Sequence, residues 1–124
     1  MKTLLWVAFG SALGGAARHA VGLALPAASD SRLPWSTLAV NVVGAFCIGL
    51  VAASSGPDGR MVMNENFRLF LMVGVLGGFT TFSAFSLQTL EMLQSGQLER
   101  AALYALGSVL VCLMGVWAGF WIVK

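Results

Sequence analysis

Three long stretches of the chain contain no charged residue. They run from Leu33 to Pro57, from Leu69 to Leu90 and from Ala101 to Val123. Each is longer than the roughly 20 apolar residues that a helix needs to cross about 30 Å of hydrocarbon. Apolar positions follow one another in these stretches, whereas the strands of a membrane barrel alternate apolar and polar positions. The pattern therefore predicts membrane-spanning helices.

The start of the chain is also apolar but less uniform. Thr3–Ala17 carries no charge, Arg18 and His19 interrupt it, and apolar residues then resume to about Leu25. The run that follows Lys2 has some features of a secretory signal peptide, but its removal would leave an unusual bundle of three spans. We therefore expect an all-α membrane protein with a single domain over residues 1–124. Its four helices are expected at about residues 3–25, 35–55, 67–95 and 99–123.

Composition agrees with this pattern. Only 10% of the residues are charged and 58% are hydrophobic, whereas an average soluble domain carries about 25% charged residues. So few charges cannot coat a soluble globule, and they exclude a disordered tail and a nucleic-acid-binding protein. Cys47 and Cys112 both lie inside apolar runs, where a free thiol acts as a small hydrophobic group. We expect a multi-pass protein of the plasma membrane (a bacterial inner membrane) that contacts lipid and no nucleic acid.

The basic residues divide almost evenly between the two ends of the expected bundle. Four spans put Lys2, Arg60, Arg68 and Lys124 on one side, and Arg32, Arg100 and, depending on its depth, Arg18 on the other. Orientation normally follows an excess of Lys and Arg on the cytoplasmic side, and here that excess is small. A single, weakly biased orientation and insertion in both orientations both remain open. Insertion both ways would make an antiparallel homodimer natural.

Glycine is frequent inside the expected spans. Gly10 with Gly14 and Gly115 with Gly119 form two G-x-x-x-G pairs, which allow helix backbones to approach closely. Packing within one protomer explains either pair taken alone. Together they also suit an obligate dimer.

Polar and helix-breaking residues lie in the middle of the second and third spans. Gly77 and Gly78 precede Thr80 and Thr81, a sequence at which a helix can break where its freed carbonyls line a cavity or coordinate an ion. The alternative is a kinked, continuous helix whose hydroxyl groups bond back to the preceding turn. Asn41, midway along the second span, is either an interhelical hydrogen-bonding residue or part of a hydrated path.

Aromatic rings and hydroxyl groups recur at helical spacing beyond that point. Phe82 and Phe85 are three residues apart and so share a helix face. Their positive ring edges could tolerate an anion, although packing against lipid or a neighbouring helix is the commoner role. Tyr104, Ser108 and Cys112 recur at intervals of four on one face of the last span. Such a line of donors suits a solute that only accepts hydrogen bonds.

The stretch GGFTTFSAFS at Gly77–Ser86 closely resembles the third-helix signature of the Fluc/CrcB family of fluoride channels. The resemblance extends over nearly the whole chain and includes Gly10–Arg18, Asn41–Gly44, and Tyr104 with Ser108. It implies a dual-topology homodimer of two antiparallel four-helix protomers, each with its third helix broken near the middle. Both subunits would contribute to each of two separate fluoride pores, through which fluoride leaves the cytoplasm passively and confers fluoride resistance.

The resemblance also implies roles for individual residues. The rings of Phe82 and Phe85 would contact fluoride with their edges, and Arg18 would lie by an aqueous vestibule. Gly77 and Thr80 would offer backbone carbonyls to a structural sodium ion at the dimer centre. Hydrogen-bond donors along the pore would be Asn41, Tyr104 and Ser108, with Thr81 and Ser83 as further members. The chain departs from many relatives at Gln88, where they have Glu, and from some at Cys112, where they have a hydroxyl group.

Three other functions would also suit a small apolar protein. A small dual-topology multidrug or cation exporter is the strongest alternative, but coupled export needs an acid within the membrane. Here Glu91 lies at the end of the third span and the first span has no acid. A non-transporting assembly subunit would not need Asn41. An enzyme is not expected, because His19 has no carboxylate or thiol near it in sequence.

Overall fold

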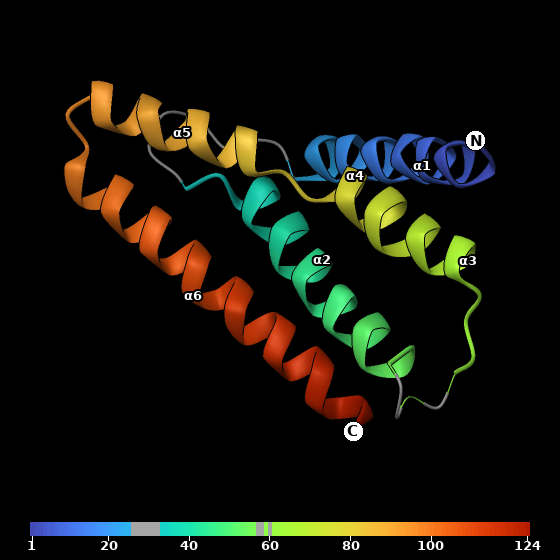
Figure 1. Cartoon of the computed structure of the whole chain (residues 1–124). Coiled ribbons are helices and arrows are strands. Elements are labelled where there is room, and N and C mark those ends of the chain that lie inside the picture. Colours follow the sequence, from blue (N-terminus) through green and yellow to red (C-terminus); the bar gives the residue numbers. More distant parts are fainter. Residues whose placement is uncertain (26–32, 57–58, 60) are drawn as a thin grey trace.

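The computed structural model describes residues 1–25, 33–56, 59 and 61–124, and all regular structure within these ranges is helical. Two helices come first, α1 (Lys2–Ala24) and α2 (Trp35–Ser54). A continuous rod follows, made of α3 (Glu65–Leu69), the π-helix η1 (Phe70–Leu76) and the short α4 (Gly77–Phe79). The chain ends with α5 (Phe82–Gln94) and α6 (Leu98–Val123), as Figure 1 shows. Arg32 and Arg60, which enter the expected charge balance, lie outside the described residues.

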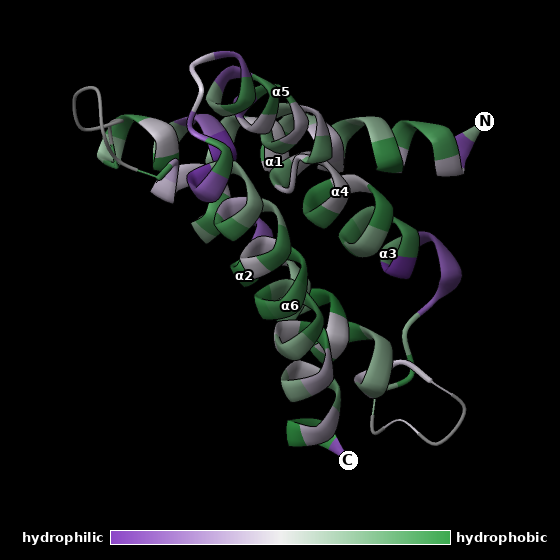
Figure 2. Ribbon diagram, turned by 90° about the vertical axis from the view of Figure 1, so that its left-hand side faces the viewer, coloured by the Kyte–Doolittle hydropathy of each residue, from purple (hydrophilic) through white to green (hydrophobic). Residues whose placement is uncertain are grey.

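Three of these helical units are long and apolar enough to cross a membrane: Trp35–Ser54, Glu65–Gln94 and Leu98–Val123. Helix α1 has 23 residues but is less apolar, because Arg18 and His19 lie within it. Hydrophilic residues lie mostly near helix ends and in the connections, while hydrophobic residues cover the lengths of the helices (Figure 2). The chain is therefore an all-α, multi-pass membrane protein.

The third segment is interrupted rather than kinked. Thr80 (φ −82°, ψ 159°) and Thr81 (φ −151°, ψ 115°) are both extended, so α4 ends at Phe79 and α5 begins at Phe82. The two glycines that open α4 weaken the helix, and the β-branched threonines suit extended backbone. The Oγ1 atom of Thr81 then accepts a hydrogen bond of 3.2 Å from the amide of Ala84 and so caps α5. Of the two alternatives that composition leaves open, the structure has the break.

The two glycine pairs hold the helices together within this one chain. Gly10 and Gly14 are buried where α1 crosses η1, and a Cβ atom on Gly14 would overlap the carbonyl oxygen of Val75. At the other end of the sequence, a Cβ atom on Gly119 in α6 would overlap the carbonyl oxygen of Phe46 in α2. Backbones this close gain dispersion contacts that replace a large hydrophobic core.

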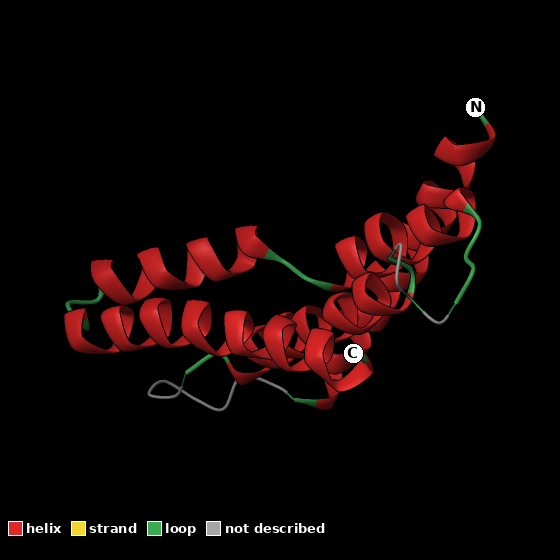
Figure 3. Cartoon of the chain, turned by 60° about the horizontal axis from the view of Figure 1, so that its bottom comes forward, coloured by secondary structure: helices red, strands yellow, loops and turns green. Residues whose placement is uncertain are grey.

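The buried apolar core is indeed small. Among the described residues its members are Val40, Ala53, Ala101 and Tyr104. Large apolar side chains instead face outward, such as Leu103 at 64% and Trp117 at 66% exposed. In water such a surface would aggregate, whereas lipid chains cover it at no cost. Figure 3 shows α5 and α6 running side by side, with the rest of the third segment turned away from them beyond the break.

Replacing Gly14 by alanine should destabilise the protein, because the new methyl group meets rigid backbone. The expected loss is about 1–3 kcal/mol, the range for overpacked sites. Gly15→Ala is the matched control, since a Cβ atom there has nothing within 4 Å. Thermal unfolding in detergent, followed by tryptophan fluorescence, measures both. Equal stability of the two variants would contradict this account of the α1–η1 contact.

Candidate functional site

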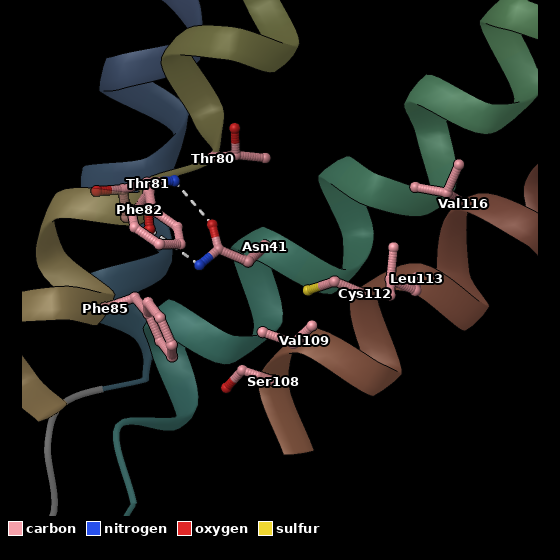
Figure 4. Close-up of a pocket in the computed structure, with 10 residues that line it drawn as sticks. All are labelled: Asn41, Thr80, Thr81, Phe82, Phe85, Ser108, Val109, Cys112, Leu113 and Val116. Carbon is pink, nitrogen blue, oxygen red and sulfur yellow. Dashed lines mark hydrogen bonds between the residues drawn. The ribbon is translucent and has the colours of Figure 1, made fainter. Parts of the chain in front are cut away.

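The break lies beside a cavity of about 330 Å³ that three helices and the extended segment enclose in part. Helix α2 contributes Asn41, the extended segment contributes Thr80 and Thr81, and α6 supplies most of the opposite wall (Figure 4). The complete lining is Asn41, Thr80, Thr81, Phe82, Phe85, Ser108, Val109, Cys112, Leu113 and Val116. We call this the break cavity.

Asn41 binds the backbone of the break with both ends of its side-chain amide. Its Nδ2 donates to the carbonyl oxygen of Thr81 at 3.0 Å, and its Oδ1 accepts from the amide of the same residue at 2.7 Å. Figure 4 shows both bonds, with the amide of Asn41 turned toward Thr81. The side chain thus satisfies two backbone groups of an interrupted helix, which would otherwise be costly at membrane depth.

This pairing also changes which carbonyl groups have donors. In a continuous helix the amide of Thr81 would donate to the carbonyl of Gly77, and the amide of Ala84 would donate to that of Thr80. Here the first amide donates to Asn41 and the second to the hydroxyl group of Thr81. The carbonyl groups of Gly77 and Thr80 therefore lose the amides that would donate hydrogen bonds to them in a continuous helix. Backbone carbonyl oxygens of this kind are the ligands that suit a hard cation. No group of three or more His, Cys, Asp or Glu side chains that could hold a metal occurs within the described ranges.

Aromatic rings form one side of the break cavity. The centroids of Phe82 and Phe85 lie 5.3 Å apart with a 50° angle between ring planes, and Phe85 lies at the same distance from Tyr104. Phe82 is 76% exposed in the single chain, while Tyr104 is buried. The ring of Phe85 is therefore held between two neighbours, whereas Phe82 projects from the protomer.

Ser108 supplies a hydroxyl group with no partner. It is 6% exposed, and its Oγ atom is the buried side-chain polar atom that lacks a hydrogen bond in the part of the chain the structure describes. Such groups are rare, because each costs about 1–3 kcal/mol. Ser108 lines the break cavity one helical turn from Cys112, amid apolar side chains. An acceptor that enters the cavity would find a donor already free.

Tyr104 lies outside that lining, although it shares a helix face with Ser108. Its hydroxyl group donates to Oε1 of Gln88 at 2.8 Å, and Nε2 of Gln88 donates to Oγ1 of Thr37 at 2.9 Å. The chain of bonds ties α6 through α5 to the start of α2. Sequence reasoning did not find Thr37, which is buried yet carries no distinguishing motif. The neutral amide of Gln88 accepts the hydrogen bond from Tyr104 and donates the one to Thr37, so neither bond needs a charged side chain at this position.

The remaining expected site residues lie close by. Arg18 lines a second cavity of about 320 Å³ on the other side of the break, together with His19, Thr37 and Thr81. Ser83 does not line the break cavity, but its Oγ lies 3.2 Å from Oγ1 of Thr81. Thr81 lines both cavities, whereas Ser83 and Tyr104 line neither of the two.

Replacing Asn41 by leucine should destabilise the protein more than replacing Ser108 by alanine. The first change leaves the amide and carbonyl of Thr81 unpaired, at about 1–3 kcal/mol for each group. The second removes a buried hydroxyl group that has no partner, so the free energy of unfolding should not fall and should rise by up to about 1–3 kcal/mol. Thermal unfolding of both variants in detergent measures the difference. A larger loss for Ser108→Ala would contradict the hydrogen-bond assignment.

Comparison with known proteins shows the family to which the chain belongs. The profile of the family described as "CrcB-like protein, Camphor Resistance (CrcB)" matches residues 5–120. A relative from Paramagnetospirillum magneticum, named fluoride-specific ion channel, is 47% identical over 96% of this chain and 93% of its own length. A relative of the same name from Opitutus terrae is also 47% identical, over 96% of this chain and 90% of its own length. A relative of the same name in Geobacter sulfurreducens is 44% identical over 96% of this chain and 94% of its own. Proteins with this name are ion channels, so the expectation that the chain is not an enzyme is confirmed. The chain belongs to the CrcB family.

Proposed function

We propose that this protein is a fluoride-selective channel through which fluoride leaves the bacterial cytoplasm passively, across the inner membrane. The observation that carries the proposal is the unpartnered hydroxyl group of Ser108, which faces a cavity walled by the rings of Phe82 and Phe85. The names of the relatives support the choice of ion. Within the lining of this cavity there is no charged residue.

The chemistry of the cavity suits fluoride. Fluoride is small, strongly hydrated and a good hydrogen-bond acceptor, so a pore must replace water with several donors and still release the ion. A free hydroxyl group and positive ring edges attract an anion without the full charge of a buried lysine. The amide of Asn41 adds a donor, since Nδ2 carries two hydrogen atoms and only one is used by Thr81. Residues proposed along the path are Asn41, Thr81, Phe82, Ser83, Phe85, Tyr104 and Ser108, with Arg18 at the vestibule.

We propose further that two copies assemble as an antiparallel homodimer with two pores, in which α1 is the fourth span of each protomer. Phe82 is 76% exposed in one chain, although it lines the cavity. A second copy that covers this ring would close the open side of the cavity. The nearly even distribution of basic residues is compatible with insertion in both orientations.

A structural sodium ion at the centre of that dimer would be held by the backbone carbonyls of Gly77 and Thr80. Both carbonyls have lost their usual helical donors, and oxygen atoms of unwound backbone suit a hard cation. Two carbonyls are too few for full coordination, so a second copy would supply the others. When bound, the ion would supply positive charge and join the protomers.

Purified protein in liposomes should release fluoride and retain chloride. Ser108→Ala removes the free donor, and the fluoride efflux rate should fall by about ten- to hundredfold, since a hydrogen bond to a charged group contributes about 1.5–3 kcal/mol. Phe82→Ile should also reduce efflux, because it removes the ring edge. A fluoride electrode measures the rate.

The matched control is Val109→Ala, which shortens a side chain in the lining of the same cavity without removing a donor. Its efflux rate should stay close to that of the unaltered protein. Chloride release as fast as fluoride release would refute selectivity. Unchanged fluoride efflux in both Ser108→Ala and Phe82→Ile would refute the assignment of the pore.

Replacing sodium by N-methylglucamine during purification should destabilise the dimer. An ion that binds only the folded dimer stabilises it by about 2.7 kcal/mol at a concentration 100 times its dissociation constant. Light scattering coupled to gel filtration should show dimers in sodium and a fraction of monomers without it. Identical masses and unfolding temperatures in both buffers would exclude a structural sodium ion.

A further inference from the structure

One group of residues far from the break has no part in the proposed channel. It lies where the start of α1 meets α3 and the residues just before it, near the N-terminal end of the chain (Figure 1). Lys2, Leu5, Trp6 and Phe9 line a cavity of about 400 Å³. Trp6 also lines a neighbouring cavity of about 180 Å³ with Asn64, Asn66 and Phe67. We call the two cavities together the α1–α3 groove.

An aromatic cluster that includes Trp6, Phe9 and Phe67 packs beside the groove. Phe70 lies at its centre, with Trp6 at 5.7 Å edge-on and Phe9 at 6.2 Å stacked, between ring centroids. Phe67 stacks on it from α3 at 6.0 Å. Although the cluster is well packed, Trp6 is 47% and Phe9 59% exposed. A half-exposed tryptophan at a helix end favours the boundary between lipid chains and headgroups.

Two side-chain amides in the groove present donors rather than acceptors. The Oδ1 atom of Asn66 accepts from the hydroxyl group of Thr3 at 2.9 Å, and that of Asn64 accepts from the amide of Phe67 at 2.8 Å. Both oxygen atoms are thereby engaged, and neither Nδ2 group has an acceptor among the described residues. Each exposed Nδ2 group can therefore donate to a group outside the protein.

The charge around the groove is positive. Lys2 lines it and Arg68 is exposed in the last turn of α3, whereas Glu65 is the one exposed acid of α3, within the residues that the structure describes. The opposite end of the bundle, between α5 and α6, has two exposed acids, Glu91 and Glu99, and one exposed base, Arg100. An anion is therefore attracted to the α1–α3 end and not to the α5–α6 end.

We propose that the α1–α3 groove binds one anionic phospholipid, of the phosphatidylglycerol type. Lys2 and the Nδ2 groups of Asn64 and Asn66 contact the phosphate, while Leu5, Trp6 and Phe9 contact the first part of an acyl chain. A free phosphate ion would leave the apolar wall of the groove unused, whereas a lipid uses both parts. The proposal does not depend on which ion the protein conducts.

Titration of the purified, full-length protein with phosphatidylglycerol in neutral detergent tests the proposal, with bound lipids counted by native mass spectrometry. Phosphatidylglycerol should be retained at concentrations where phosphatidylcholine is not. Lys2→Gln should weaken its binding about fivefold, the factor that corresponds to about 1 kcal/mol for one basic residue at an anionic surface. Asn66→Ala should weaken it also.

The matched control is Lys124→Gln, which removes an exposed basic residue at the end of α6, 5.0 Å from the ring of Phe120. Binding of phosphatidylglycerol should be unchanged in this variant, and all variants should elute from gel filtration like the unaltered protein. Equal binding of the two lipids, or equal weakening by Lys2→Gln and Lys124→Gln, would overturn the proposal. Displacement of the lipid by millimolar inorganic phosphate would show a phosphate site instead, and would also overturn it.

Discussion

The pairing of Asn41 with Thr81 is the interaction on which the rest of the structure depends. Two short hydrogen bonds, of 2.7 and 3.0 Å, join the side chain of α2 to the backbone between α4 and α5. They make an interrupted helix tolerable in an apolar surrounding, because the exposed peptide groups are satisfied by a neighbour instead of by water. They also fix where Phe82 begins the next helix. Without Asn41, an ordinary helix through Gly77–Phe85 would satisfy the same groups and close the site.

A second constraint is the supply of hydrogen-bond donors around the break. The hydroxyl group of Tyr104 donates a hydrogen bond to Gln88, and the amide of Gln88 donates one to Thr37, so these groups satisfy one another. Ser108 is left out of every such bond, although it is buried. Under the proposed function, this free hydroxyl group is the donor that the ligand would use. The polar residues thus form two sets. Tyr104, Gln88 and Thr37 satisfy one another, whereas Ser108 keeps a free donor.

Much of this arrangement could be predicted from the sequence. The charge-free runs predict helices. The pair Gly77 and Gly78 before Thr80 and Thr81 indicates a site at which the third helix can break or kink. The sequence could not decide between a break and a kink, because that outcome depends on whether a distant residue, Asn41, satisfies the freed groups. Helical spacing correctly puts Tyr104 and Ser108 on one face. Helical spacing does not predict that Gln88 accepts a hydrogen bond from the hydroxyl group of Tyr104 across the interface between two helices.

The close approach of α2 and α6 explains why the break cavity is open on one side in a single chain. Helices α2 and α6 approach through Gly49 and Gly119, where side chains are absent and backbones nearly touch. Such contacts leave little volume between the helices, so a cavity can form only where the third segment bends away from them at the break. One wall of that cavity is then necessarily missing, and the exposed ring of Phe82 marks its edge. In a single chain, lipid chains would cover this open edge, and they can neither accept a hydrogen bond nor solvate an ion. Under the proposed function, a second copy would cover the edge instead, so that assembly of the dimer would complete the path for fluoride beside the buried hydroxyl group of Ser108.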